Sequence, residues 1–144
     1  MLTVEESVVI DKPRPEVFEF FSDPDNVAVY SSNLVDYEVV SGGPREVGRS
    51  ARFAVKVVGV RLEYTDEVTE LVENERLSTA SKDGRIPYSI TMTFADDGLG
   101  TQVTWRQEVE SLGGVFKLGD GLVMKMYSRD VRSNLDKAKA LLEG

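Results

Sequence analysis

Polar side chains that could do chemistry recur among apolar neighbours in several stretches of alternating sequence. Six of them share the phase of hydrophobic residues, namely Glu6, Tyr64, Asp66, Tyr88, Trp105 and Gln107. Because alternate side chains of a strand point to the same face, we expect these six on an apolar face. A phenol placed there needs a hydrogen-bond partner, which either the protein or a ligand could supply. Tyr64, Tyr88 and a carboxylate such as Glu6 are therefore the candidate groups for moving protons.

The residue inventory narrows this chemistry, because the chain contains no histidine and no cysteine. Disulfides, thiolate nucleophiles and cysteine-based zinc or iron–sulfur sites are thereby excluded. Catalysis by serine–histidine or cysteine–histidine pairs is excluded as well. Aspartate, glutamate, lysine, tyrosine and ordered water remain for proton transfer. We expect neither a cofactor nor a metal.

The charged residues of the strands are expected to avoid an apolar interior. An unpaired buried carboxylate either costs free energy or has a raised pKa. We therefore expect Glu6 near water at a strand edge, or paired with a cation such as Arg52 or Arg106. Arg52, Lys56, Arg61 and Arg106 have the opposite phase and predict a solvated outer face. The alternative is that β-bulges invert the phase and an arginine meets a ligand carboxylate.

Glycines flank a short apolar segment near the predicted last helix. Gly114 and Gly119 have the spacing of the glycines in a phosphate-binding loop, but Asp120 follows where that loop requires Lys and then Ser or Thr. The acid would repel phosphate, so nucleotide binding is not expected. We instead predict that these glycines let Val115, Phe116 and Leu118 open as an apolar lid.

Periodicity predicts the elements that position these side chains. Alternation with period two predicts strands over 2–10, 34–39, 51–58, 60–72, 76–81, 86–94 and 101–109. Two short helices are predicted between Pro15 and Tyr30, with Asp23 capping the second. A long helix is predicted from apolar residues at helical spacing, which are Leu118, Leu122, Met126, Leu135, Ala138 and Leu142.

One helix cannot cover a flat sheet of seven strands, because a helix is only about 10–12 Å wide. We therefore expect an α+β helix-grip fold, in which a curved antiparallel sheet surrounds the C-terminal helix and leaves an apolar pocket. The predicted pocket lining is Phe53, Val55, Tyr64, Tyr88, Met92, Trp105, Leu122 and Met126.

Three segments are similar to a known family. They are IDKPRPEVFEFFSDP at 10–24, Gly100-Thr101 leading into Val103-Thr104-Trp105, and LDKAKALLE at 135–143. Together with the element order, they resemble the START-like (SRPBCC) superfamily, which includes polyketide cyclases and dehydrases and lipid-transport proteins. The resemblance implies a helix-grip fold and a cavity reached past the front of the last helix. It implies an apolar ligand, but no catalytic motif transfers residue by residue.

Composition limits the partners. With 41% hydrophobic and 29% charged residues, 1–144 is expected to form one globular domain. A formal net charge of −8 argues against nucleic acid as the main partner. Apolar stretches are too short for stable membrane insertion, and the first residues lack the pattern of a signal peptide. We expect a cytoplasmic monomer or homodimer.

Three functions remain open at this point. The first is binding or carriage of an apolar small molecule such as a lipid or polyketide. The second is a polyketide cyclase or dehydrase that uses tyrosine or carboxylate acid–base groups. Two or more ionisable groups converging in the cavity would favour the enzyme, whereas a wholly apolar lining would favour carriage. The third is a protein-binding module, which an exposed apolar patch would recommend.

Overall fold

Seven strands and three helices make up the chain, and the computed structural model describes all residues 1–144. In chain order they are β1 (Leu2–Ile10), α1 (Arg14–Ser22), α2 (Pro24–Tyr30), β2 (Leu34–Ser41), β3 (Ser50–Val57), β4 (Val60–Val72), β5 (Arg76–Ser81), β6 (Tyr88–Asp97), β7 (Gly100–Val109) and α3 (Asp120–Glu143). The predicted α+β fold class and the order of its elements are confirmed.

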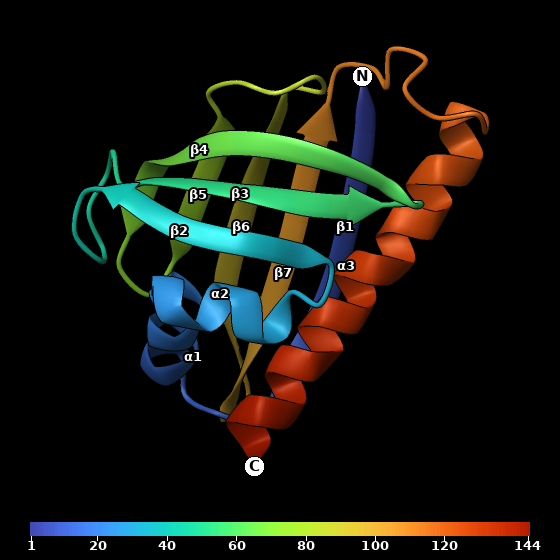
Figure 1. Cartoon of the computed structure of the whole chain (residues 1–144). Coiled ribbons are helices and arrows are strands. Elements are labelled where there is room, and N and C mark those ends of the chain that lie inside the picture. Colours follow the sequence, from blue (N-terminus) through green and yellow to red (C-terminus); the bar gives the residue numbers. More distant parts are fainter.

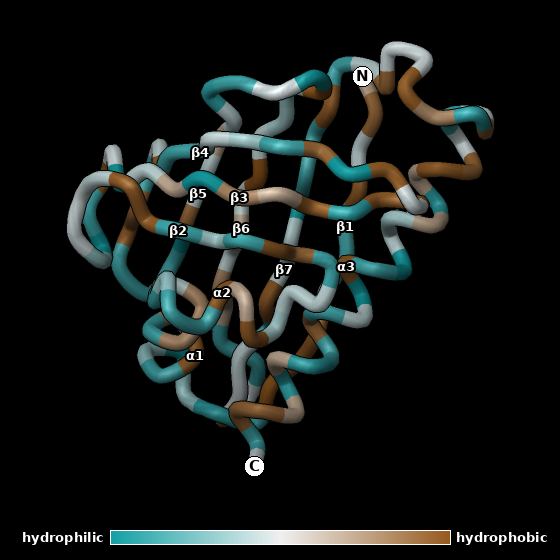
Figure 2. The backbone as a smooth tube through the Cα atoms, in the orientation of Figure 1, coloured by the Kyte–Doolittle hydropathy of each residue, from teal (hydrophilic) through white to brown (hydrophobic).

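The strands form one antiparallel sheet in the order β1-β7-β6-β5-β4-β3-β2. The sheet curves so strongly that β2, β3 and β4 pass in front of β6 and β7, while α3 runs beside β1 (Figure 1). This is the helix-grip arrangement. Figure 2 shows brown and teal residues alternating along the strands, which is the pattern that predicted them.

Strand β6 begins at Tyr88, two residues later than the alternation predicts. Pro87 precedes it and has no N–H to donate to a neighbouring strand. Ile86 is nevertheless 4% exposed, so its side chain belongs to the core although its backbone is outside the strand.

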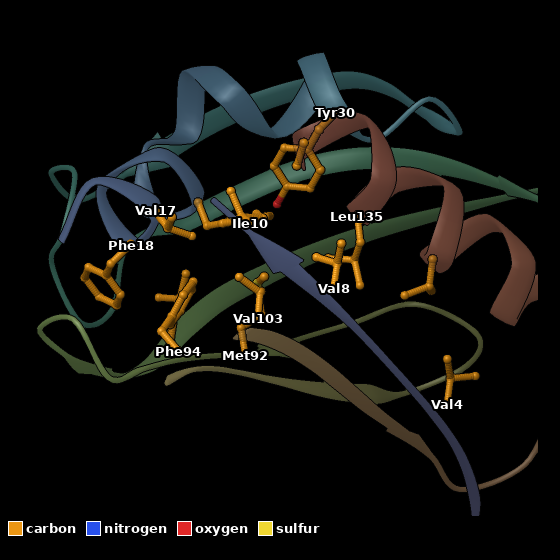
Figure 3. Close-up of a cluster of buried hydrophobic side chains, with 14 of the residues drawn as sticks. Val4, Val8, Ile10, Val17, Phe18, Tyr30, Met92, Phe94, Val103 and Leu135 are labelled. Atoms are coloured by element: carbon orange, nitrogen blue, oxygen red, sulfur yellow. The ribbon is translucent and has the colours of Figure 1, made fainter. Parts of the chain in front are cut away.

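Side chains from both ends of the chain form the larger core cluster (Figure 3). Ile10, Val17, Phe18 and Leu135 are each at most 1% exposed. The Phe18 ring meets Phe94 edge-on with 5.1 Å between centroids. Burial of one such side chain contributes about 1.5–3 kcal/mol, so this cluster anchors α1 and the end of α3 to the sheet.

Hydrogen bonds stabilise the end of α1 and the start of α2, where the two helices meet. Asp23 caps α2 as predicted, because its side chain accepts a hydrogen bond of 2.9 Å from the Asp25 N–H. At the end of α1, the Ser22 carbonyl accepts a hydrogen bond of 3.0 Å from Arg49 Nη1. A basic group is favourable there, since the carbonyl end of a helix carries partial negative charge.

The long helix buries the second half of the predicted apolar stripe but not the first half. Its buried residues are Val123, Val131, Leu135 and Ala138. Leu122 is 50% exposed and Met126 is 36% exposed. Met126 and Leu135 are nine residues, or about two and a half turns, apart and so lie on opposite faces. The prediction had combined apolar residues from both faces of α3. No helix of the chain has the length and apolar character needed to cross a membrane.

Candidate functional site

A cavity of about 170 Å³ lies between the concave face of the sheet and α3. Hydrophobic residues account for 25 of its 32 lining residues. Its size is similar to that of an engineered protein cavity of about 150 Å³ that binds benzene. The cavity therefore has room for a compact apolar group.

Six of the eight residues predicted to line a pocket do line this cavity. They are Phe53, Val55, Tyr64, Tyr88, Met92 and Trp105. Leu122 and Met126 do not, because they lie on the exposed face of α3. The helix instead contributes Val123, Met124, Tyr127, Val131 and Asn134. That any of these residues binds a ligand remains a prediction.

Aromatic rings form a continuous row along one wall of the cavity. The centroid distances are 5.9 Å from Tyr37 to Phe53 and 5.8 Å from Phe53 to Tyr64. Tyr64 meets Tyr88 edge-on at 4.9 Å. Phe53 and Tyr64 are paired across β3 and β4, so the sheet register itself builds this row. Such a wall suits a flat or apolar ligand.

Both phenols singled out from the sequence find partners within the protein. The Tyr64 hydroxyl donates a hydrogen bond of 2.8 Å to the Ile86 carbonyl, and burial raises the Tyr64 pKa to about 12. The Tyr88 hydroxyl donates a hydrogen bond of 3.2 Å to Oδ2 of Asp66. Burial raises the pKa of Tyr88 well above its ordinary value, so this phenol stays protonated at neutral pH.

Asp66 supplies the only carboxylate among the lining residues. Burial raises its pKa to about 6, and the Tyr88 hydrogen bond and the Arg49 charge oppose that rise. Asp66 is therefore close to its titration range at neutral pH. Together, Asp66 and Tyr88 place a proton acceptor and a hydrogen-bond donor in the cavity.

A second set of hydrogen-bonded side chains in the cavity joins β7 to α3. Gln107 Oε1 accepts hydrogen bonds of 2.7 Å from the Tyr127 hydroxyl and 3.2 Å from Trp105 Nε1. Burial raises the pKa of Tyr127, so its hydroxyl remains a donor. The two bonds hold the Trp105 indole against the cavity in a defined orientation.

Arg49 is the one basic residue of the cavity, and its place there was not predicted from the sequence. It is 5% exposed, lines the cavity, and immediately precedes β3. The predicted strand began at Ala51, which left Arg49 in a turn without an assigned face. It nevertheless shares the phase of Ala51, Phe53 and Val55. Extending the alternation back by two residues would have pointed Arg49 inward.

Glu6 lies outside the cavity, between β1 and α3. It accepts a hydrogen bond of 3.0 Å from Ser128 Oγ, and its Oε1 lies 3.8 Å from Nη1 of Arg132. Glu6 therefore lies at a strand edge and beside a cation, as expected, but the cation is Arg132 and neither Arg52 nor Arg106. The sequence could not show that α3 brings a cation to this edge strand. Asp66 replaces Glu6 as the carboxylate of the site.

The strand cations form the solvated outer face that their phase predicts. Arg52, Lys56, Arg61 and Arg106 are exposed and do not line the cavity. The three arginines pair with neighbouring acids at Arg52–Glu38 3.3 Å, Arg61–Asp36 3.3 Å and Arg106–Glu5 3.0 Å. Exposed pairs of this kind contribute little stability.

The loop before α3 brings one residue of the predicted lid to the cavity. Phe116 lines it, whereas Leu118 is 42% exposed. Gly113 and Gly114 have φ values of 60° and 72°, a backbone region that favours glycine. Movement of this segment remains a prediction. No group of three or more acidic side chains is placed to hold a metal ion.

Comparison with solved structures shows a shared fold. Protein TTHA0849 from Thermus thermophilus has a TM-score of 0.86 at 22% identity, covering 99% of this chain and 97% of the other. A START superfamily protein from Mycobacterium smegmatis has a TM-score of 0.81 at 14% identity, covering 98% and 97%. The Zhui aromatase/cyclase from Streptomyces sp. R1128 has a TM-score of 0.79 at 18% identity, covering 99% and 93%.

At the level of sequence, no curated protein matches the chain. A family model described as "Polyketide cyclase / dehydrase and lipid transport" does match, over residues 1–143. The match covers nearly the whole chain, including every strand that lines the cavity. The resemblance to START-like proteins is thereby confirmed, and the chain belongs to the polyketide cyclase/dehydrase and lipid transport family.

Proposed function

We propose that the chain binds or carries a lipid, a polyketide or a similar apolar small molecule in the cavity between the sheet and α3. The observation that carries this proposal is the cavity of about 170 Å³ with 25 hydrophobic residues among the 32 that line it. Cavities lined mainly by apolar side chains with a few polar groups are typical ligand sites. The family description, which names lipid transport, supports the proposal.

The fluorescence of Trp105 tests it, since Trp105 is the only tryptophan and lines the cavity. Titration with fatty acids, sterols and aromatic polyketide mimics is expected to change its emission saturably. Native mass spectrometry of the purified protein would also detect a molecule retained in the cavity. The absence of any saturable response across this panel would contradict the proposal.

A second candidate function is an enzyme that transfers protons on a bound polyketide. The hydrogen-bonded pair of Asp66 and Tyr88 favours it, because two ionisable groups converge in the cavity. Asp66 would act as the base, since a pKa of about 6 keeps it mainly ionised at neutral pH. Tyr88 would turn its single hydroxyl proton from Asp66 to a ligand carbonyl.

One experiment distinguishes ligand binding from catalysis. A poly-β-keto thioester is incubated with the chain and with an Asp66→Asn variant, and the products are resolved by chromatography. The enzyme predicts cyclised or dehydrated product that the variant forms at least about a hundredfold more slowly. A binder predicts that the chain leaves the compound unchanged although Trp105 emission reports its binding.

A further inference from the structure

The guanidinium of Arg49 is buried without a carboxylate partner. Its single hydrogen bond, of 3.0 Å, goes from Nη1 to the Ser22 carbonyl. Arg49 takes part in none of the ion pairs of the structure. A buried cation is normally paired, because removing it from water without an opposite charge is costly. The carbonyl end of α1 compensates this charge only in part.

The remaining donors of Arg49 are not fully enclosed by protein atoms. Every fully enclosed side-chain nitrogen or oxygen has a hydrogen-bond partner. Nε and Nη2 of Arg49 have none, so they are not fully enclosed, and Arg49 lines the cavity while only 5% of the residue is exposed. A guanidinium presents these donors in a planar fork that matches the two oxygens of a carboxylate.

The polar groups around Arg49 form one end of the cavity. The Arg49 carbonyl accepts a hydrogen bond of 2.9 Å from the Val68 N–H, and Ala51 is the register partner of Asp66, so Arg49 and Asp66 are near neighbours on the concave face of β3 and β4. Burial raises the pKa values of Asp66, Tyr30 and Tyr37, and the positive charge of Arg49 opposes that rise in each. Val109 and Leu112, which also line the cavity, pack with Val57 and Leu62 at the opposite end of the β3–β4 pair. The charged groups of the cavity therefore lie beside Arg49, and the lining away from them is mainly apolar.

We propose that the ligand is an amphipathic monocarboxylate whose carboxylate binds the free fork of Arg49 and whose apolar part lies along the aromatic wall. This rests on the proposed function and specifies its ligand class. The cavity volume of about 170 Å³ favours a medium-chain or aromatic acid over a long-chain lipid.

Asp66 gives this ligand class a distinctive pH dependence. Tyr88 from β6 donates a hydrogen bond to Asp66, and the charged or titratable groups that interact with Asp66 electrostatically are Arg49 and Tyr37 from β2. With Asp66 ionised, a bound carboxylate adds a second negative charge beside a single cation. With Asp66 protonated, the carboxylate and Arg49 neutralise each other. Binding therefore favours protonated Asp66, and affinity increases as pH falls through its pKa of about 6.

The test compares octanoate with 1-octanol by isothermal titration calorimetry, using the whole chain at several pH values. We expect octanoate to bind at least about tenfold more tightly than 1-octanol. Octanoate should also bind more tightly at about pH 5.5 than at about pH 8, whereas 1-octanol should not. Arg49→Gln should remove the preference for octanoate, while Arg52→Gln, at an exposed arginine paired with Glu38, should leave it unchanged.

An Asp66→Asn variant tests the proposal even if Arg49→Gln fails to fold. This substitution removes the competing negative charge, so octanoate should bind more tightly at about pH 8 and lose its pH dependence. Equal affinity for octanoate and 1-octanol, with no effect of either variant, would overturn the carboxylate assignment and leave the proposed function intact. Binding of neither probe, together with no response of Trp105 to the wider panel, would overturn both.

Discussion

The hydroxyl of Tyr88 lies 3.2 Å from Oδ2 of Asp66, although their strands are not neighbours in the sheet. Strand β5 lies between β4 and β6 and ends at Ser81, the register partner of Asp66. The Ser81 hydroxyl accepts a hydrogen bond of 2.9 Å from the Tyr88 N–H. The Tyr88 ring thus reaches past the end of β5 to the carboxylate.

Replacement of Tyr88 by Phe should raise the pKa of Asp66 further above 6, because the hydrogen bond that favours the ionised form is lost. The measurement is the pH titration of the Asp66 side-chain carboxyl carbon by NMR. Tyr64→Phe is the matched control, since Tyr64 donates to the Ile86 carbonyl and not to the carboxylate. Equal shifts in the two variants would contradict a specific effect of the Tyr88–Asp66 bond.

Asp66 should make the folded state less stable as pH rises. Its pKa is about 6 in the folded state, against about 3.9 in an unfolded chain. Between these values the folded state binds more protons, so the free energy of unfolding falls as pH increases from about 4 to 6. The loss is on the order of 3 kcal/mol, and it persists above that window.

Asp66→Asn removes this contribution. Urea denaturation of both proteins should show the variant gaining stability relative to the parent chain from about pH 4 to about pH 7. Glu6→Gln is the matched control, because its carboxylate lies outside the cavity beside Arg132. A stability difference between Asp66→Asn and the parent that does not vary with pH would contradict the raised pKa.

The strands were predictable because each has one face in the core. Alternation at Val4, Val8 and Ile10, for example, reports directly that β1 buries every second residue. The orientation of α3 was not predictable in the same way. Apolar residues occupy both of its faces near the front, and only the packed structure selects Val123 over Leu122.

Some polar residues of the site were predictable from the sequence, and others were not. Tyr64, Tyr88 and Asp66 were recognisable because they share a phase with buried residues. Their hydrogen-bond partners were not recognisable, because the hydrogen bond between Tyr88 and Asp66 depends on where β5 ends. Arg49 was not predicted because it precedes its strand by one residue, outside the alternation that starts at Ala51, and so it had no assigned face.

Filling the cavity should weaken ligand binding without unfolding the protein. Val55 lines the cavity from β3 and is only partly buried, so Val55→Phe would place a larger ring in the space. We expect at least a tenfold loss of affinity, about 1.4 kcal/mol, for any compound that changes Trp105 emission. Leu122→Phe is the control, since this exposed residue of α3 does not line the cavity. Equal affinities for the two variants would show that the ligand binds elsewhere.

The loop before α3 should open more readily than the end of that helix. Gly113 and Gly114 have no heavy atom within 4 Å of the position a Cβ would take, so little packing restrains them. Leu135 and Ala138, in contrast, are at most 1% exposed and belong to the larger core cluster. Amide hydrogens of 113–119 should therefore exchange much faster than those of 135–142.

If the loop closes over the cavity, a bound ligand should reduce the difference in amide exchange rate between 113–119 and 135–142. Phe116 lines the cavity, so contact with a ligand would restrain it and slow exchange in 113–119 while leaving 135–142 unaffected. Hydrogen exchange followed by mass spectrometry, with and without a compound that changes Trp105 emission, measures both segments at once. Protection of 113–119 equal to that of 135–142 in the free protein would rule out the lid.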